Sequence, residues 1–271
     1  GERFGYPLTR FLRFLRNPFA HFVRTSARNQ VNLRATFDNV VSLDKGYGEI
    51  KSGALPHLEP IIRLVKTLRD ERSGKPEYRG ERFRETILTP TDLQLYPELR
   101  EFVCSDTLIQ IASDYFGAVP VLRTVQGWWS VYNEYLESSQ LFHVDSNDRR
   151  TLKFLINIED VTESDGPFTF IPANITKQIL TNIAAPNQRI TDEEVFKYCH
   201  AEDVVHAVGP AGTCFIVDGA RCLHFGARTR GGSRLLLLVE FHNFFCPKAA
   251  NIPLAPSENW FPDDKLRKLI L

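Results

Sequence analysis

The chain has 271 residues, and its 33 basic and 33 acidic side chains give a formal net charge of zero. This balance offers no general attraction to nucleic acid, and no apolar run approaches the roughly 20 residues that a membrane-spanning helix needs. No signal peptide is recognisable, and an odd number of cysteines without a CxxC pair favours reduced thiols, so we expect a cytoplasmic protein; the five are Cys104, Cys199, Cys214, Cys222 and Cys246.

The first 34 residues interleave arginines with apolar side chains. Glu2 alone opposes Arg3, Arg10, Arg13, Arg16, Arg24, Arg28 and Arg34. The pattern predicts a basic amphipathic helix, which could contact a partner or lie on a membrane surface. The simpler interpretation is a helix that packs on its own domain with solvated arginines.

Three further helices are predicted before residue 118. Between residues 55 and 72, apolar side chains recur at helical spacing, and Ser73-Gly74 ends the pattern. A polar stretch that extends to about Glu85 predicts a loop. Residues 92–103 have a helical pattern, and Ser105-Asp106 predicts the cap of another helix over residues 107–116, ended by Gly117.

Strand patterns begin at Val121. They cover residues 122–135, 152–158, 167–171, the surroundings of Val204, and residues 213–217 and 234–245, with a helical insert at 191–200. Helices followed by strands favour an α+β protein over a βαβ series, and short strands with Gly-rich turns favour a jelly roll. We expect residues 1–271 to form one domain: a mainly helical part to about 118, a jelly-roll core at about 119–246 and a C-terminal extension at 247–271.

The strongest functional signal is the motif Phe142-His143-Val144-Asp145, together with His224 and Arg234. In an extended segment, His143 and Asp145 lie on one face because strand side chains alternate. His224 could complete a two-histidine, one-carboxylate triad, which holds a metal and leaves positions open for other ligands. A histidine on a strand can also be an ordinary core residue, but the apolar strands beside His224 and Arg234 favour a metal site. Arg234 starts an apolar strand, where a buried charge needs a partner such as a carboxylate.

From about residue 107 to 245 the chain resembles the phytanoyl-CoA dioxygenase-like branch of the Fe(II)/2-oxoglutarate oxygenases. Residues 108–117 are similar to the helix before that family's barrel. The His143-Val144-Asp145 motif is similar to its metal motif, and Asp165-Gly166-Pro167-Phe168 to the turn that follows. The family's usual Pro-Gly-Ser-His segment is absent, and this chain has Pro172-Ala173-Asn174-Ile175 in its place.

The resemblance implies a double-stranded β-helix with Fe(II) bound by His143, Asp145 and His224, which would form the catalytic centre. It implies that 2-oxoglutarate and O₂ are cosubstrates, with Arg234 binding the far carboxylate of 2-oxoglutarate. The implied reaction hydroxylates an unactivated C–H bond of a small molecule and releases succinate and CO₂. Related halogenases lack the carboxylate ligand, so Asp145 favours hydroxylation.

Other polar residues are weaker candidates. Gln126 and Ser130 share a strand face and could contact 2-oxoglutarate or form an outward polar face, and Lys153 could pair with a carboxylate or be solvated. Arg228 and Arg230 could face an anionic substrate, although a solvent-exposed turn is the simpler interpretation. Two other functions stay open: a zinc or manganese jelly-roll isomerase, and a binding module whose site is vestigial. The sequence does not indicate which small molecule is the substrate.

Overall fold

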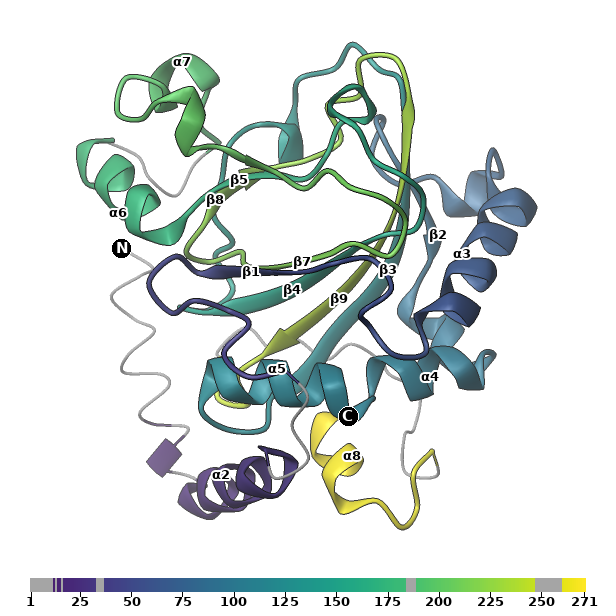
Figure 1. The fold of residues 1–271 in the computed structure, drawn as a ribbon, viewed down its shortest axis with the longest axis vertical. Coiled ribbons are helices and arrows are strands. Elements are labelled where there is room, and N and C mark those ends of the chain that lie inside the picture. The colour runs from purple at the N-terminus through teal and green to yellow at the C-terminus, as the bar shows by residue number, and fades with distance from the viewer. Residues whose placement is uncertain (1–11, 13, 16, 33–36, 184–188, 247–259) are drawn as a thin grey trace.

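A computed structural model describes residues 12, 14–15, 17–32, 37–183, 189–246 and 260–271 of the chain. Within these residues the strands form two antiparallel sheets that face each other (Figure 1). The larger sheet has the order β1-β7-β4-β9-β3-β2 and the smaller has the order β6-β5-β8. The strands are β1 Tyr47–Ile50, β2 Glu85–Leu88, β3 Val121–Val131, β4 Thr151–Asn157, β5 Thr169–Ile171, β6 Val205–His206, β7 Cys214–Asp218, β8 Leu223–Phe225 and β9 Ser233–His242.

The helices flank this core. Figure 1 shows α2, α3, α4, α5 and α8 around the larger sheet, and α6 and α7 beside the smaller one. The helices are α2 Pro18–Asn32, α3 Leu58–Arg72, α4 Pro97–Val103, α5 Asp106–Phe116, α6 Ala173–Asn182, α7 Asp192–Val195 and α8 Lys265–Ile270. The protein therefore has the predicted α+β fold, a double-stranded β-helix with flanking helices. No helix in these segments is long and apolar enough to cross a membrane.

Local sequence signals explain the clearest helices. The apolar stripe of α3 is buried against the larger sheet, as a helix with one apolar face requires. Ser105 caps α5 by accepting a hydrogen bond from the backbone N–H of Leu108 at 3.5 Å. Gly117 ends this helix with a φ of 77°, a left-handed conformation that glycine adopts without strain.

Several predicted boundaries are wrong. The single helix expected at residues 92–103 is a 3-10 helix, Pro90–Gln94, followed by α4. Pro97 causes this break, because a proline disfavours helical geometry at the residue before it and is tolerated in the first turn of a helix. The long strand expected to reach residue 135 ends at Val131, and only Asp192–Val195 of the insert is an α-helix.

Five of the helices and strands, β1, β2, β8, α6 and α8, were not predicted, and β8 is the strand that carries His224. Strands β1 and β2 are the two edges of the larger sheet and have four residues each. Strands so short carry too little alternation to show a period of two. The part of the chain expected to be mainly helical therefore also contributes both edge strands.

The two sheets enclose an apolar core. Leu155 of β4, Phe215 of β7 and Leu238 of β9 meet Phe170 of β5 inside the barrel. The opposite face of the larger sheet packs on the helices, so nearly every residue of β4, β7 and β9 is buried. Polar side chains on the inner faces are consequently removed from water and need partners.

Candidate metal centre

Two histidines and one aspartate meet between the two sheets. One nitrogen or oxygen atom from each of His143, Asp145 and His224 lies within 4.8 Å of the others. The backbones of His143 and His224 exchange two hydrogen bonds, of 3.0 and 2.9 Å. Directly opposed residues of an antiparallel pair have their side chains on the same face, so this pairing places both imidazoles together, with ring centroids 4.2 Å apart.

Backbone carbonyls orient both imidazoles. Nδ1 of His143 lies 2.8 Å from the carbonyl oxygen of Leu141, and Nδ1 of His224 lies 2.9 Å from that of Cys222. Because a carbonyl only accepts, each Nδ1 carries the proton and each Nε2 keeps its lone pair. Burial also lowers the pKa of His224 to about 4, so this imidazole is neutral near pH 7, as a metal ligand must be.

The carboxylate of Asp145 is held by a buried lysine. Nζ of Lys153 lies 2.6 Å from Oδ2, and the hydroxyl of Thr151 donates to the same oxygen at 3.4 Å. Oδ1 faces Nε2 of His224 at 3.8 Å. Burial would raise the pKa of Asp145, but Lys153 together with the two histidines outweighs it and the pKa is lowered, so the group is ionised. Neutral imidazoles with one carboxylate fit a metal such as Fe(II) and leave coordination positions for further ligands.

Arg234 has an unsatisfied guanidinium beside this centre. Its side chain is 2% exposed, and neither Nε nor Nη1 has a hydrogen-bond partner among the described residues. Ser130 lies directly opposite on β3, and its buried hydroxyl also has no partner there. Burial, with a smaller effect of Arg84, lowers the pKa of Arg234 to about 9, which still leaves it charged at pH 7. A buried unpaired charge is expensive, so this arrangement is suited to receive an anion.

The remaining candidates differ in their surroundings. Lys153 is 9% exposed, so the alternative of a solvated lysine is wrong, and its carboxylate partner is Asp145 of the protein itself. Gln126 is half-buried on β3, opposite Leu238. Arg228 forms a double ion pair with Asp192 at 2.6 and 2.8 Å, and it is therefore already occupied.

Two arginines near the centre were not recognised in the sequence. Arg84 precedes β2, and Arg189 precedes the residue that forms a bridge with Phe142. Both belong to irregular stretches with no metal or anion motif. Their position depends on which strands pair with which, so no local signal could have identified them.

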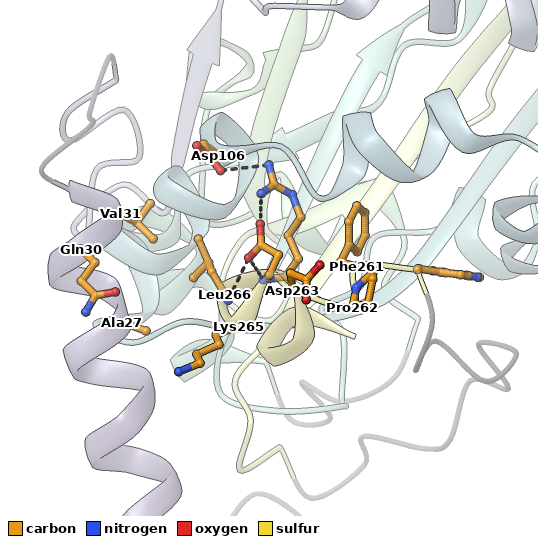
Figure 2. Close-up of a pocket in the computed structure, with 12 residues that line it drawn as sticks. Ala27, Gln30, Val31, Asp106, Phe261, Pro262, Asp263, Lys265 and Leu266 are labelled. Atoms are coloured by element: carbon orange, nitrogen blue, oxygen red, sulfur yellow. Dashed lines mark hydrogen bonds and ion pairs between the residues drawn. The ribbon is translucent and has the colours of Figure 1, made fainter.

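A separate cleft of about 640 Å³ lies between α2, the start of α5 and the C-terminal segment (Figure 2). Arg267 lines the cleft and pairs with Asp106 at 3.1 Å and with Asp264. The cleft is lined by helices and the C-terminal segment, and none of the strands that carry the triad and Arg234 contributes to it. It is therefore distinct from the candidate metal centre.

No family model matches the chain, and no curated protein is similar to it. Solved structures are similar in fold. The chain is 17% identical to the non-heme alpha-ketoglutarate-dependent carbocyclase SnoK from nogalamycin biosynthesis, with a TM-score of 0.55 over 78% of this chain and 85% of SnoK. It is 13% identical to EctD from S. alaskensis, whose structure holds 2-oxoglutarate and 5-hydroxyectoine, with a TM-score of 0.55 and coverage of 77% and 78%.

A third similar structure is the epimerase SnoN, solved with Fe³⁺, alpha-ketoglutarate and nogalamycin RO. It is 16% identical, with a TM-score of 0.50 over 80% of this chain and 84% of SnoN. At these identities the likeness establishes the fold, which agrees with the two facing sheets described above.

Proposed function

We propose that the chain is an Fe(II)- and 2-oxoglutarate-dependent dioxygenase of the phytanoyl-CoA dioxygenase-like branch. The observation that carries this proposal is the combination of the triad with the unpaired guanidinium of Arg234, inside the same barrel. A metal and a carboxylate anchor are the two groups that 2-oxoglutarate requires. The similar fold of SnoK, SnoN and EctD, which are described with alpha-ketoglutarate or 2-oxoglutarate, supports the same class.

Each residue near the centre has a role that its contacts support. His143, Asp145 and His224 would hold iron, with both Nε2 atoms available and Asp145 oriented by Lys153. Bound iron would supply O₂ activation coupled to the oxidation of 2-oxoglutarate. Arg234 would bind the far carboxylate with its planar fork, and the hydroxyl of Ser130 could donate to the same group.

The proposed overall reaction converts 2-oxoglutarate, O₂ and a C–H bond of a small molecule into succinate, CO₂ and an alcohol. One oxygen atom enters succinate and the other enters the alcohol. Asp145 supports hydroxylation over halogenation, because the carboxylate occupies the position that a halide would need. The apolar wall between the sheets would exclude bulk water from the site. All five cysteines are buried, which supports a reducing cytoplasmic setting.

The test is succinate formation by protein supplied with Fe(II), ascorbate and 2-oxoglutarate, with and without candidate substrates. We expect His143→Ala to abolish both iron binding and succinate formation. Arg234→Ala should raise the KM for 2-oxoglutarate about tenfold or more, because it removes a charge-assisted double hydrogen bond. Arg230→Ala, in an exposed turn near this strand, is the control and should leave both quantities unchanged.

Other results would contradict the proposal. If Arg234→Ala bound 2-oxoglutarate as tightly as the wild type, Arg234 would not be the residue that binds the far carboxylate of the cosubstrate. A site that fills with zinc or manganese and binds no 2-oxoglutarate would favour an isomerase, and a folded protein that binds neither would favour a non-catalytic module. A product heavier than the substrate by one oxygen atom would support hydroxylation, whereas a product lacking two hydrogens would indicate ring closure or desaturation.

A further inference from the structure

Two arginines that the proposed chemistry leaves unused, Arg84 and Arg189, lie on the inner faces of the two opposing sheets. We infer that the substrate is an organic anion, whose carboxylate or phosphate is bound by Arg189 together with Arg84. This inference rests on the proposed function.

The position of Arg189 follows from strand pairing. Ile190 and Phe142 exchange backbone hydrogen bonds of 3.1 and 2.8 Å, which places Arg189 opposite His143, itself opposite His224. Opposed residues share a face, so Arg189 extends from the same face as the two imidazoles. Phe142 and Ile190 instead pack in the apolar cluster on the other face.

The electrostatics agree with this position. The carboxylates of Asp145 and Glu81 lie close enough to act on the charge of Arg189. Arg189 is exposed, and no hydrogen bond or ion pair joins it to any residue that the structure describes. It is therefore a cation without a direct partner among these residues, within electrostatic range of the candidate ligand Asp145.

Arg84 has the corresponding position on the larger sheet. Strand β2 pairs Thr86 with Trp128 and Glu85 with Trp129. One step further along the same register, Arg84 lies opposite Ser130, which lies opposite Arg234. The guanidinium of Arg84 stacks 4.0 Å from the ring centroid of Trp128.

Arg84 is also only partly satisfied. Its Nη2 pairs with Glu81 at 3.2 Å, whereas its buried Nε has no partner among the described residues. Glu81 in turn accepts hydrogen bonds from the hydroxyls of Ser138 and Ser139, at 2.8 and 3.1 Å. Arg84 lies close enough to Arg234 for their charges to repel, and Arg189 lies close enough to Arg84 for the same effect. Arg84 is therefore positioned between Arg234, which would bind the cosubstrate, and Arg189.

A charge balance of the barrel interior favours an anion. Three cations have acidic partners: Lys153 with Asp145 at 2.6 Å, His242 with Glu240 at 2.6 Å, and Arg84 with Glu81. A divalent metal and the 2-oxoglutarate dianion would together add no net charge, and Arg234 would bind the far carboxylate of 2-oxoglutarate. Arg189 is then the cation that a neutral substrate would leave without a direct acidic partner among the described residues. An anionic substrate would form charge-assisted hydrogen bonds with Arg189 and with the unsatisfied Nε of Arg84.

The experiment compares an acid with a neutral molecule of the same shape. Under anaerobic conditions, protein loaded with Fe(II) and 2-oxoglutarate is titrated calorimetrically with 3-phenylpropionate, phenyl phosphate and 3-phenylpropanamide. We expect at least one of the two anions to bind about tenfold more tightly than the amide, as one charge-assisted contact provides. Arg189→Gln should lose that advantage while keeping amide and 2-oxoglutarate affinity.

Variants of the second arginine and a control complete the design. Arg84→Gln should weaken anion binding in the same way, whereas Arg84→Lys should retain part of it because the charge remains. Arg63→Gln removes an exposed arginine on helix α3, outside the barrel, and should change nothing. Circular dichroism of each variant checks that the fold is retained.

Several results would overturn the inference. These are equal binding of acids and amide, absence of acid binding, or anion binding that both arginine variants leave intact. A loss of 2-oxoglutarate affinity in Arg189→Gln and Arg84→Gln would also overturn it, because the arginines would then serve the cosubstrate. Binding of 2-oxoglutarate to the wild-type protein is measured first. If the wild-type protein binds no 2-oxoglutarate, the proposed function is refuted; if it binds 2-oxoglutarate but shows no preference for the anions, only this inference is refuted.

Discussion

At the candidate metal centre, two backbone carbonyls determine which nitrogen of each imidazole can bind a metal. The carbonyls of Leu141 and Cys222 accept from Nδ1 of His143 and His224 and leave both Nε2 atoms as electron-pair donors. Lys153 completes the arrangement by binding one carboxylate oxygen of Asp145. Supporting contacts of this kind set the tautomer and orientation of metal ligands.

Gly219 provides a test of how closely Asp145 is packed. A Cβ atom at this position would overlap Oδ2 of Asp145 and lie 3.1 Å from Cε of Lys153. We expect Gly219→Ala to displace the carboxylate and weaken Fe(II) binding about tenfold or more, as other losses of ligand support do. Gly231→Ala is the control, because a Cβ there would meet no atom within 4 Å. Equal metal affinities in the two variants would contradict the proposed role of Asp145.

His242 predicts a pH dependence of stability. Burial lowers its pKa, but hydrogen bonds with Cys246 and Glu240 outweigh this and raise the pKa from 6.5 to about 9. Because the folded pKa is the higher one, the stabilisation is complete below pH 6.5 and is lost as the pH rises through 9. The loss should be at most about 3 kcal/mol. Urea unfolding across this range should show a steeper decline for the wild type than for His242→Gln, and parallel curves would exclude the effect.

At the scale of elements, strand alternation divides β9 between two tasks. Leu235, Leu237 and Val239 point to the helical side and join the larger apolar cluster. Arg234 and Glu240 fall on the opposite face, toward the barrel interior. One strand therefore anchors the core and supplies the polar groups of the site, because its side chains alternate with a period of two.

Helix α3 is attached to the segment after β2 by a buried ion pair. Arg72 donates to both carboxylate oxygens of Asp92, at 2.8 and 2.9 Å, and to the carbonyl of Ile87 at 2.9 Å. We expect Arg72→Ala to lower the free energy of unfolding by about 3 kcal/mol, because it leaves the carboxylate buried without its cation. Lys51→Ala, which breaks an exposed pair with Glu49, should cost less than about 1 kcal/mol. Thermal unfolding of both variants checks the difference.

At the scale of the whole molecule, we propose that the chain forms one domain. Strand β1 pairs with β7, and β2 pairs with β3, so both parts of the chain contribute to one sheet. The N-terminal helix α2 packs against α5, and its Arg24 is 6% exposed. The expectation that all arginines of this helix are solvated is therefore wrong for Arg24. Contact of the helix with a partner or membrane stays a prediction.

Arg24 should carry much of the attachment of α2. Its Nη1 donates to the carbonyls of Val119 and Pro120 at 3.0 and 3.1 Å, and its guanidinium lies 4.1 Å from the ring centroid of Phe244. We expect Arg24→Ala to lower the free energy of unfolding by about 2 kcal/mol, because two carbonyls lose their donor. Arg28→Ala, on the same helix and partly exposed, should cost less than about 1 kcal/mol. Similar losses in both variants would show that the buried contacts contribute little.

The sequence by itself determined what depends on near neighbours in the chain. The stripe of α3, the Ser105 and Gly117 ends of α5, and the shared face of His143 and Asp145 follow from periods and caps that span a few residues. The α+β class followed from the order of these patterns. Short strands were missed because four residues carry too little pattern, whereas the break at Pro97 has a local cause that the helical pattern of residues 92–103 concealed.

The tertiary structure alone decided which distant residues meet. His143 joins His224, Lys153 binds Asp145, and Arg84 and Arg189 face the interior because particular strands pair in a particular register. A shift of one residue in any pairing would turn these side chains to the other face. Local patterns contain no information about register between segments far apart in the chain. The candidate ligands and Arg234 could therefore be predicted from the sequence, whereas the partner of Lys153 and the positions of Arg84 and Arg189 could not.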